Sequence, residues 1–124
     1  MLEQMVALAL VMWGLWFTPP VIVIEGFDHD LGNVAQSSGP EIVTPCLIAV
    51  DNARFALLST AYQQSTITHE VGHCLGLGHF GTCNGSEVAL MGCGILPGPT
   101  EVDRAALVRA HGYKVIVGGW SYDN

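Results

Sequence analysis

The sequence has few charged residues, and the basic ones are the scarcest. Four Lys and Arg stand against eleven Asp and Glu in 124 residues, which gives a net charge of −7 with neutral histidines. A surface with this balance repels phosphate backbones and anionic lipid headgroups, so it argues against nucleic acid and membrane partners. Half of the residues are apolar. This composition predicts one globular domain spanning residues 1–124 and excludes a disordered chain.

Long hydrophobic runs are also missing, so no membrane span is predicted. The apolar run 6–17 has the length of a signal-peptide core, but it has acidic Glu3 ahead of it and prolines 19 and 20 in place of a cleavage site. We therefore favour a buried first helix that ends at the two prolines over a signal or anchor. Three aromatic residues at near-helical spacing are assigned to its core face: Trp13, Trp16 and Phe17.

Short stretches rich in β-branched residues predict the strands of a small twisted mixed sheet. Residues 21–25 read as a buried strand, and residues 26–40 as a polar loop that holds at most one weak strand. The run 45–50 follows two prolines, which lack the N–H group that a central strand uses, so we place it near a sheet edge. The tail 114–117 predicts a last strand.

Two further helices complete a predicted α/β (α+β) fold. The first runs from about 62 to 76 and carries most of the histidines, and a glycine-rich loop over 78–99 follows it. The second begins at Thr100, because Asp103 three residues later completes a pattern similar to a capping box. The order of elements is therefore helix, strands, helix, irregular loop, helix.

The sequence has four cysteines, which permit three disulfide pairings or none. Cys83 and Cys93 lie in the predicted loop and could form a bridge in an oxidising compartment. The chain has no convincing signal peptide. We nevertheless predict an extracellular, secreted protein, because secretion suits a chain with four cysteines.

Three of the five histidines lie in the segment 68–80, T-H-E-V-G-H-C-L-G-L-G-H-F. On a helix, His69 and His73 lie on one face, about 6 Å apart along the axis. His79 can join them only if the helix breaks, and Gly76 is the residue at which a left-handed turn costs least. Three imidazoles would then leave one position of a tetrahedral Zn²⁺ open, as in catalytic zinc sites.

Glu70 follows the first of these histidines directly. Its carboxylate can lie beside water at the open position without binding the metal. Because zinc lowers the pKa of such a water, Glu70 can act as the general base while the water attacks a carbonyl. The pattern predicts a monomeric enzyme that hydrolyses bonds in a peptide or protein substrate.

The residues H-E-V-G-H-C-L-G-L-G-H at 69–79 resemble the H-E-x-x-H-x-x-G-x-x-H signature of the metzincin zinc endopeptidases. The segments G-L-G-H at 76–79 and A-L-M at 89–91 are most similar to those of the matrixins. The resemblance implies a zincin-like fold, one catalytic Zn²⁺ with Glu70 as base, and Met91 as the Met-turn residue that supports the site. It implies three zinc ligands: His69, His73 and His79.

The resemblance implies further features. The run 43–50 would border the cleft and pair with an extended substrate. Matrixin loops bind structural ions, so a second ion near Asp28, His29 and Asp30 is an alternative to a simply solvated loop. In matrixins an acidic residue in the last helix has a further structural role. Asp103 is therefore either a helix cap alone or a residue with that role as well.

The chain departs from the family at its start. Matrixins begin with a strand that lies inside the sheet ahead of the first helix, whereas this chain begins almost in the helix. A vacant central slot would expose two strand edges. We therefore predict that the strand 114–117 fills the slot, the alternative being a surface tail.

Two alternative functions remain. One is a catalytically silent zinc protein of metzincin fold that binds peptides or partners, in which Cys83 or Cys93 closes the coordination as a fourth ligand. The other is a metal-dependent hydrolase of non-peptide bonds. Glu70 favours turnover, because a purely structural site has no use for it.

Overall fold

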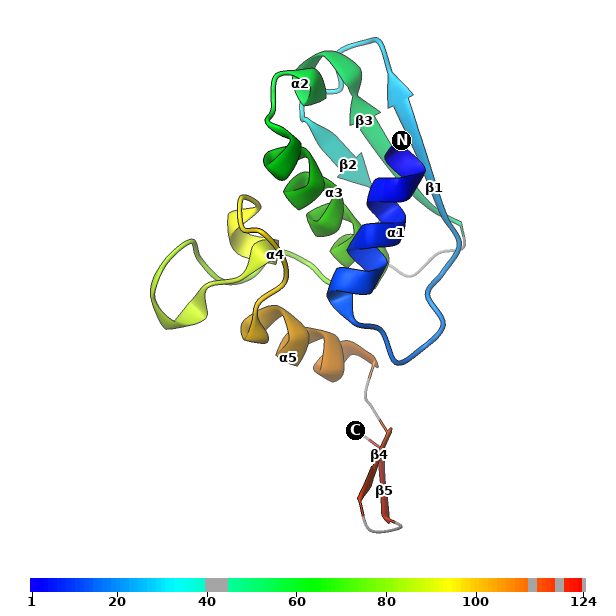
Figure 1. Ribbon diagram of the computed structural model, residues 1–124, viewed down its shortest axis with the longest axis vertical. Helices are drawn as coiled ribbons and strands as arrows, with labels where there is room; N and C mark the ends of the chain where they lie inside the picture. The colour runs from blue at the N-terminus through cyan, green and yellow to red at the C-terminus, as the bar shows by residue number, and fades with distance from the viewer. Residues whose placement is uncertain (40–44, 112–113, 118–119, 124) are drawn as a thin grey trace.

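The computed structural model describes residues 1–39, 45–111, 114–117 and 120–123. In Figure 1, two long helices lie side by side and cover one face of a small sheet. They are α1 (Leu2–Trp13) and α3 (Thr60–Cys74), and the short α2 (Asn52–Ala56) lies between the sheet and α3 in the chain. An irregular lower part holds η1 (Gly85–Glu87), α4 (Leu90–Cys93) and α5 (Glu101–His111). This is a small mixed α/β fold, as predicted.

The sheet has three strands in the order β1-β3-β2. β1 (Ile22–Phe27) runs parallel to β3 (Cys46–Asp51), and β2 (Ala35–Ser37) runs antiparallel on its other side. The edge position predicted for the run 45–50 is therefore wrong, because β3 is central. Pro45 immediately precedes the strand, so its missing N–H removes no hydrogen bond from the ladder.

The C-terminal strand predicted over 114–117 is present, but its predicted place inside the main sheet is wrong. β4 (Lys114–Val117) pairs antiparallel with β5 (Trp120–Asp123) in a separate two-stranded sheet. β1 and β3 pair directly over six residues, so there is no slot between them. A strand that pairs with its neighbour in sequence closes a much shorter loop than one that crosses the molecule, which favours the local pairing.

The first helix ends earlier than predicted. Gly14 has a φ of 64° and caps α1. Val6, Ala9 and Trp13 are its buried face, but Trp16 is 42% exposed. The assignment of Trp16 to the core is therefore wrong, because it lies beyond the helix and no longer follows the helical spacing.

The helix α3 carries the histidine segment and lies deepest in the molecule. The Ser59 side chain caps its start by accepting from the Tyr62 N–H. Its last residue, Cys74, forms a fully buried disulfide with Cys46 of the central strand. The helix is thus fixed at both ends, and its C-terminal half is a rigid support for side chains.

The second disulfide joins Cys83 to Cys93, as one of the predicted pairings has it. No helix among the described residues is both long and apolar enough to cross a bilayer.

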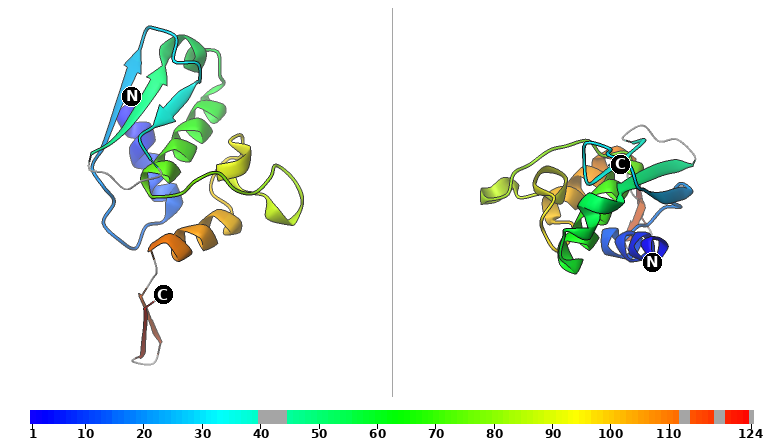
Figure 2. Two further views of the ribbon diagram at one scale, coloured as in Figure 1. Left: turned by 180° about the vertical axis from the view of Figure 1, so that it is seen from behind. Right: turned by 90° about the horizontal axis from the view of Figure 1, so that it is seen from above.

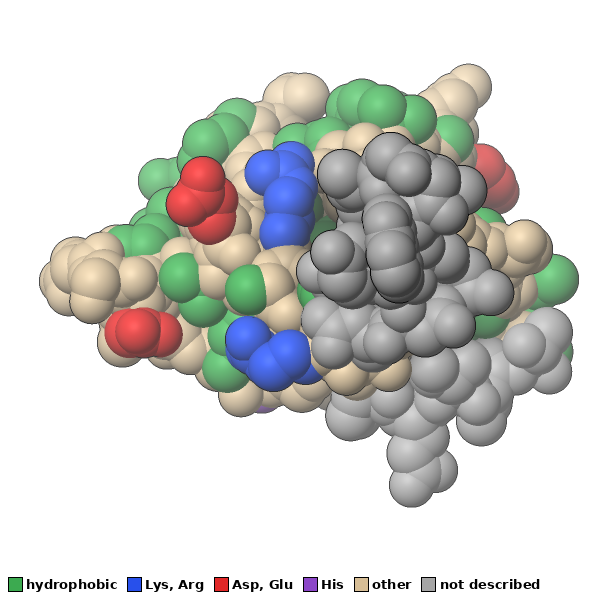
Figure 3. Space-filling model, turned by 90° about the horizontal axis from the view of Figure 1, so that it is seen from below, with side chains coloured by type: hydrophobic (Ala, Val, Ile, Leu, Met, Phe, Trp, Pro, Cys, Tyr) green, Lys and Arg blue, Asp and Glu red, His purple; other side chains and the backbone are tan. Residues whose placement is uncertain are grey.

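The views from behind and from above in Figure 2 show the α4 and η1 region extending to one side of the helices and sheet. On the face drawn in Figure 3, the charged side chains stand singly among apolar and uncharged ones.

Candidate metal centre

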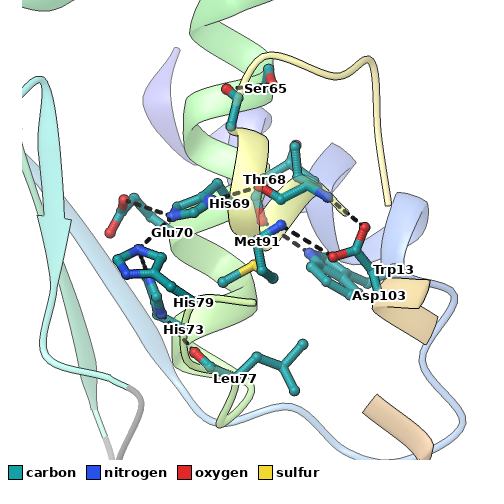
Figure 4. Close-up of polar contacts among 12 residues, drawn as sticks. Trp13, Ser65, Thr68, His69, Glu70, His73, Leu77, His79, Met91 and Asp103 are labelled. Atoms are coloured by element: carbon teal, nitrogen blue, oxygen red, sulfur yellow. Dashed lines mark hydrogen bonds and ion pairs between the residues drawn. The ribbon is translucent and has the colours of Figure 1, made fainter. Parts of the chain in front are cut away.

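The predicted chain reversal after α3 is present. The helix ends at Cys74 with Leu75 as its C-cap, and Gly76 adopts a φ of 97°, which favours glycine. The Leu77 N–H then donates to the Gly72 carbonyl. The reversal carries His79 back to the face from which His69 and His73 project, as Figure 4 shows.

The three imidazoles converge on one point. The Nε2 atom of His79 lies 3.2 Å from Nε2 of His69 and 3.1 Å from Nε2 of His73. Ligand nitrogens about 2.0–2.1 Å from a tetrahedral zinc ion stand roughly 3.3 Å apart, so the spacing fits zinc. In the described part of the chain this is the one group of three or more potential ligands that could hold a metal ion.

His69 and His73 lie on the same helix, and their hydrogen bonds determine which nitrogen of each ring is available. Nδ1 of His69 lies 2.9 Å from the Leu90 carbonyl, and Nδ1 of His73 lies 2.6 Å from the Leu77 carbonyl. A carbonyl only accepts, so each Nδ1 carries the proton and each Nε2 presents its lone pair. Burial lowers the pKa of both rings, partly offset by the carbonyl contacts. Both features favour metal binding.

Glu70 lies beside the three histidines but is not one of the converging groups. Its Oε2 atom is 4.0 Å from Nε2 of His69, and the residue is 7% exposed. Burial raises the pKa of its carboxyl to about 7. The Ser37 hydroxyl of β2 has a smaller, opposite effect on this pKa, because it favours the charged carboxylate. The contact falls short of hydrogen-bond geometry, so the buried Ser37 oxygen has no hydrogen-bond partner among the described residues. A carboxyl with this pKa can take up and release a proton near neutral pH.

Met91 lies beneath the histidines, fully buried, with its sulfur against Gly72, on which the Trp13 ring also packs. The turn that holds it depends on Asp103 of α5. This buried carboxylate accepts from the Leu90 N–H at 2.7 Å and the Met91 N–H at 3.1 Å, and from the Thr100 N–H at 2.7 Å. Asp103 is therefore both a cap and the support of the methionine turn. Since the Leu90 carbonyl holds His69, the support extends to the site.

The histidines and Glu70 open into a cleft of about 840 Å³. One wall is β2, whose outer edge is unpaired among the described strands, and the other contains Gly92 and Cys93 of α4. The strand predicted to border the cleft, residues 43–50, is instead the central strand, and residues 43 and 44 lie outside the described part. The role of β2 had no signal in the sequence, because its three residues are too few to show alternation.

The other predicted sites have different partners. Asp30 binds the Arg54 guanidinium at 3.0 Å, and Asp28 accepts from the Asn52 amide at 2.9 Å. His29 contacts the Phe27 ring edge-on. The structure thus does not bring Asp28, His29 and Asp30 together as ligands.

His111 is the last residue of α5. Its Nε2 atom contacts the Leu75 carbonyl, and its ring stacks on Phe17 at 4.1 Å. The residue therefore joins the end of α5 to the end of α3.

Comparisons with models of known protein families, with curated proteins and with solved structures found no match to this chain. The resemblance to metzincins therefore rests on the motif residues alone.

Proposed function

We propose that the protein is a zinc-dependent endopeptidase. The observation that carries the proposal is the arrangement of three bare Nε2 atoms around one point, with the carboxylate of Glu70 beside them and outside the ligand group. A closed structural zinc site uses four protein ligands, whereas three ligands leave a position for a reactant.

Held by three imidazoles, zinc supplies a Lewis acid that polarises a carbonyl group and makes water more acidic. The chain's own residues supply the rest. Leu90 and Leu77 orient two rings through their carbonyls, and Met91 fills the space below. Glu70 takes a proton from the attacking water and can return it to the leaving amine.

A peptide substrate fits the shape of the site. The cleft is open along the outer edge of β2, where no described strand pairs with it, so we propose that an extended chain pairs there. The substrate would add a strand to the sheet and lay its backbone along the row of histidines. We propose this for β2 in place of the run 43–50, and we propose that the enzyme acts as a monomer.

An extracellular location is part of the proposal. All four cysteines are in disulfides, which persist in oxidising compartments. The same pairing argues against the silent zinc protein in its predicted form, because neither Cys83 nor Cys93 is a free thiolate able to close the coordination.

The variant Glu70→Gln tests the proposal. Wild type should contain one zinc per chain and cleave an unstructured protein, and a chelator should abolish cleavage. Glu70→Gln should keep its zinc and lose cleavage by at least about 100-fold, the lower range for a general base. Glu25→Gln, an exposed glutamate on β1, is the matched control and should cleave as wild type does. Zinc-loaded wild type that cleaves no peptide would support the silent alternative, and one that cleaves only esters would support the non-peptide hydrolase.

A further inference from the structure

His79 differs from the other two histidines in how it is held. His69 and His73 each have a backbone carbonyl at Nδ1, but among the described residues the polar contacts of His79 are only those to the two other rings. It is also the exposed member of the three. Its position must therefore be set by the backbone on either side of it.

On one side of His79 is the reversal at Gly76, and on the other is a segment that packs against the methionine turn. A Cβ atom at Gly92 would collide with the carbonyl oxygens of Phe80 and Gly81, so the two backbones are in direct contact there. The segment is then paired further on. The Thr82 N–H donates to the Glu87 carbonyl at 2.8 Å, and the Ala89 N–H donates to the Thr82 carbonyl at 3.1 Å.

The disulfide between Cys83 and Cys93 links the same two segments covalently, and the Cα atoms of the two cysteines are 4.7 Å apart. Cys83 comes four positions after His79, and Cys93 two positions after Met91. The disulfide thus ties the segment that carries the third histidine to the turn beneath the site. Apart from the disulfide, the loop is held by two backbone hydrogen bonds, by the exposed contact at Gly92 and by Phe80, which packs partly buried against the core.

We infer that Cys83 and Cys93 are positioning residues for His79, and that reduction of their disulfide weakens metal binding at the three histidines. The inference rests on the proposed metal site and adds a redox dependence to it. Reduction by a dithiol breaks the S–S bond as two electrons and two protons pass to Cys83 and Cys93, and the dithiol becomes a disulfide. Supporting groups of metal ligands commonly contribute about 10- to 100-fold to affinity, and we expect a loss of that size.

The two disulfides differ in access, which makes the effect selective. Cys46 and Cys74 are fully buried, whereas Cys83 is exposed and Cys93 partly so. A reductant therefore reaches the Cys83–Cys93 bond first, while the bond that fixes α3 to β3 remains. The helix pair His69 and His73 keeps its geometry, and only the third ligand is released.

A double-mutant cycle on zinc affinity tests the inference. The Zn²⁺ Kd is measured by competition with a chromophoric chelator for wild type, Cys83→Ser with Cys93→Ser, His79→Ala, and the three substitutions together. We expect the double serine variant to bind about 10- to 100-fold more weakly. In the His79→Ala background the serine substitutions should change the Kd little, because their effect passes through His79. Ser86→Ala, an exposed serine in the same loop, is the control and should bind as wild type does.

The outcomes separate this inference from the proposed function. Failure of wild type to bind zinc would overturn both. Zinc binding by the double serine variant at the wild-type Kd, or an equal loss with and without His79, would overturn this inference alone.

A measurement on the wild type covers the case in which the serine variant does not fold. The zinc-loaded protein is treated with a phosphine, which is oxidised to its oxide with water supplying the oxygen and the two protons. Zinc release and alkylation of the freed thiols are followed together. Release in step with reduction of Cys83–Cys93, with Cys46–Cys74 intact, supports the inference, and full reduction without release overturns it.

Discussion

His69 and His73 reach the site from a helix in the core, whereas His79 reaches it from a loop at the surface. The first two are four residues apart on α3, and each ring is held by a backbone carbonyl. The third is exposed and depends on the turns around it. The difference teaches that a single candidate site can combine two histidines on a rigid helix with a third whose position other elements must set.

The largest effect is expected at Asp103, the one side chain that supports the methionine turn next to the loop of His79. Asp103→Ala leaves the N–H groups of Leu90, Met91 and Thr100 without their acceptor, each in a buried or partly buried place. Because a buried unsatisfied donor costs about 1–3 kcal/mol, we expect a loss of about 3–5 kcal/mol in the free energy of unfolding. Urea denaturation measures it. Glu101→Ala, exposed in the same helical turn, should change stability by less than about 0.5 kcal/mol, and equal effects of the two changes would contradict the role of Asp103.

The rigid side is tested by removing one of its ligands. His73→Ala should raise the Zn²⁺ Kd by more than the roughly 100-fold typical of the strongest supporting groups, because it deletes a ligand outright. His29→Ala, a histidine in an exposed loop, should leave the Kd unchanged. Metal titration by competition gives both values. A similar affinity of the two variants would show that the metal binds elsewhere.

A third test uses the carboxyl of Glu70, which lies beside the three histidines. Glu70 has a folded-state pKa of about 7 against an ordinary 4.5, so the folded protein binds more protons than the unfolded chain between these values. Its contribution is therefore fully present below pH 4.5 and is lost as pH rises through about 7, by as much as about 3 kcal/mol.

Glu70→Gln removes this dependence and keeps that of the histidines. In metal-free protein, the variant should become progressively more stable than wild type as pH rises from about 4.5 to 8. Urea unfolding in the presence of a chelator measures the difference at each pH. A difference that stays constant over this range would show that the carboxyl is not buried as described.

The smallest effect is expected at the reversal itself. Gly76→Ala places a Cβ on a residue with φ of 97°, which should cost about 1–2 kcal/mol in stability and shift His79. Gly78→Ala is the matched control, because a Cβ there meets no atom within 4 Å and its φ is ordinary. Thermal unfolding and the Zn²⁺ Kd are measured for both. Equal results for the two alanines would mean that the left-handed turn does not set the third ligand.

Much of the candidate site could be predicted because its information is local. The i and i+4 spacing of His69 and His73, and the need for a break before His79, follow from helix geometry alone. The structure confirms the break at Gly76. The capping pattern at Thr100 and Asp103 was local in the same way, and the helix begins there.

Two of the wrong predictions concern partners distant in sequence, whereas the one for Trp16 concerns the local end of a helix. Proline before β3 was read as a sign of an edge, but strand order depends on which strands meet, and β1 and β2 flank it. The tail was assigned to a slot that direct pairing of β1 with β3 removes. Trp16 was assigned to a helix that Gly14 ends first.

The sequence by itself determined which three histidines form the candidate site, the helix that carries the first two of them and the glycine at which the chain turns. These depend on dihedral preferences and spacing within about ten residues, which the order of amino acids specifies directly. Only the tertiary structure decided the pairing of the cysteines, the identity of the strand beside the cleft and the support of the methionine turn by Asp103. Each of these joins segments from different parts of the chain, and packing of the whole core selects among partners that are equally compatible with the local sequence.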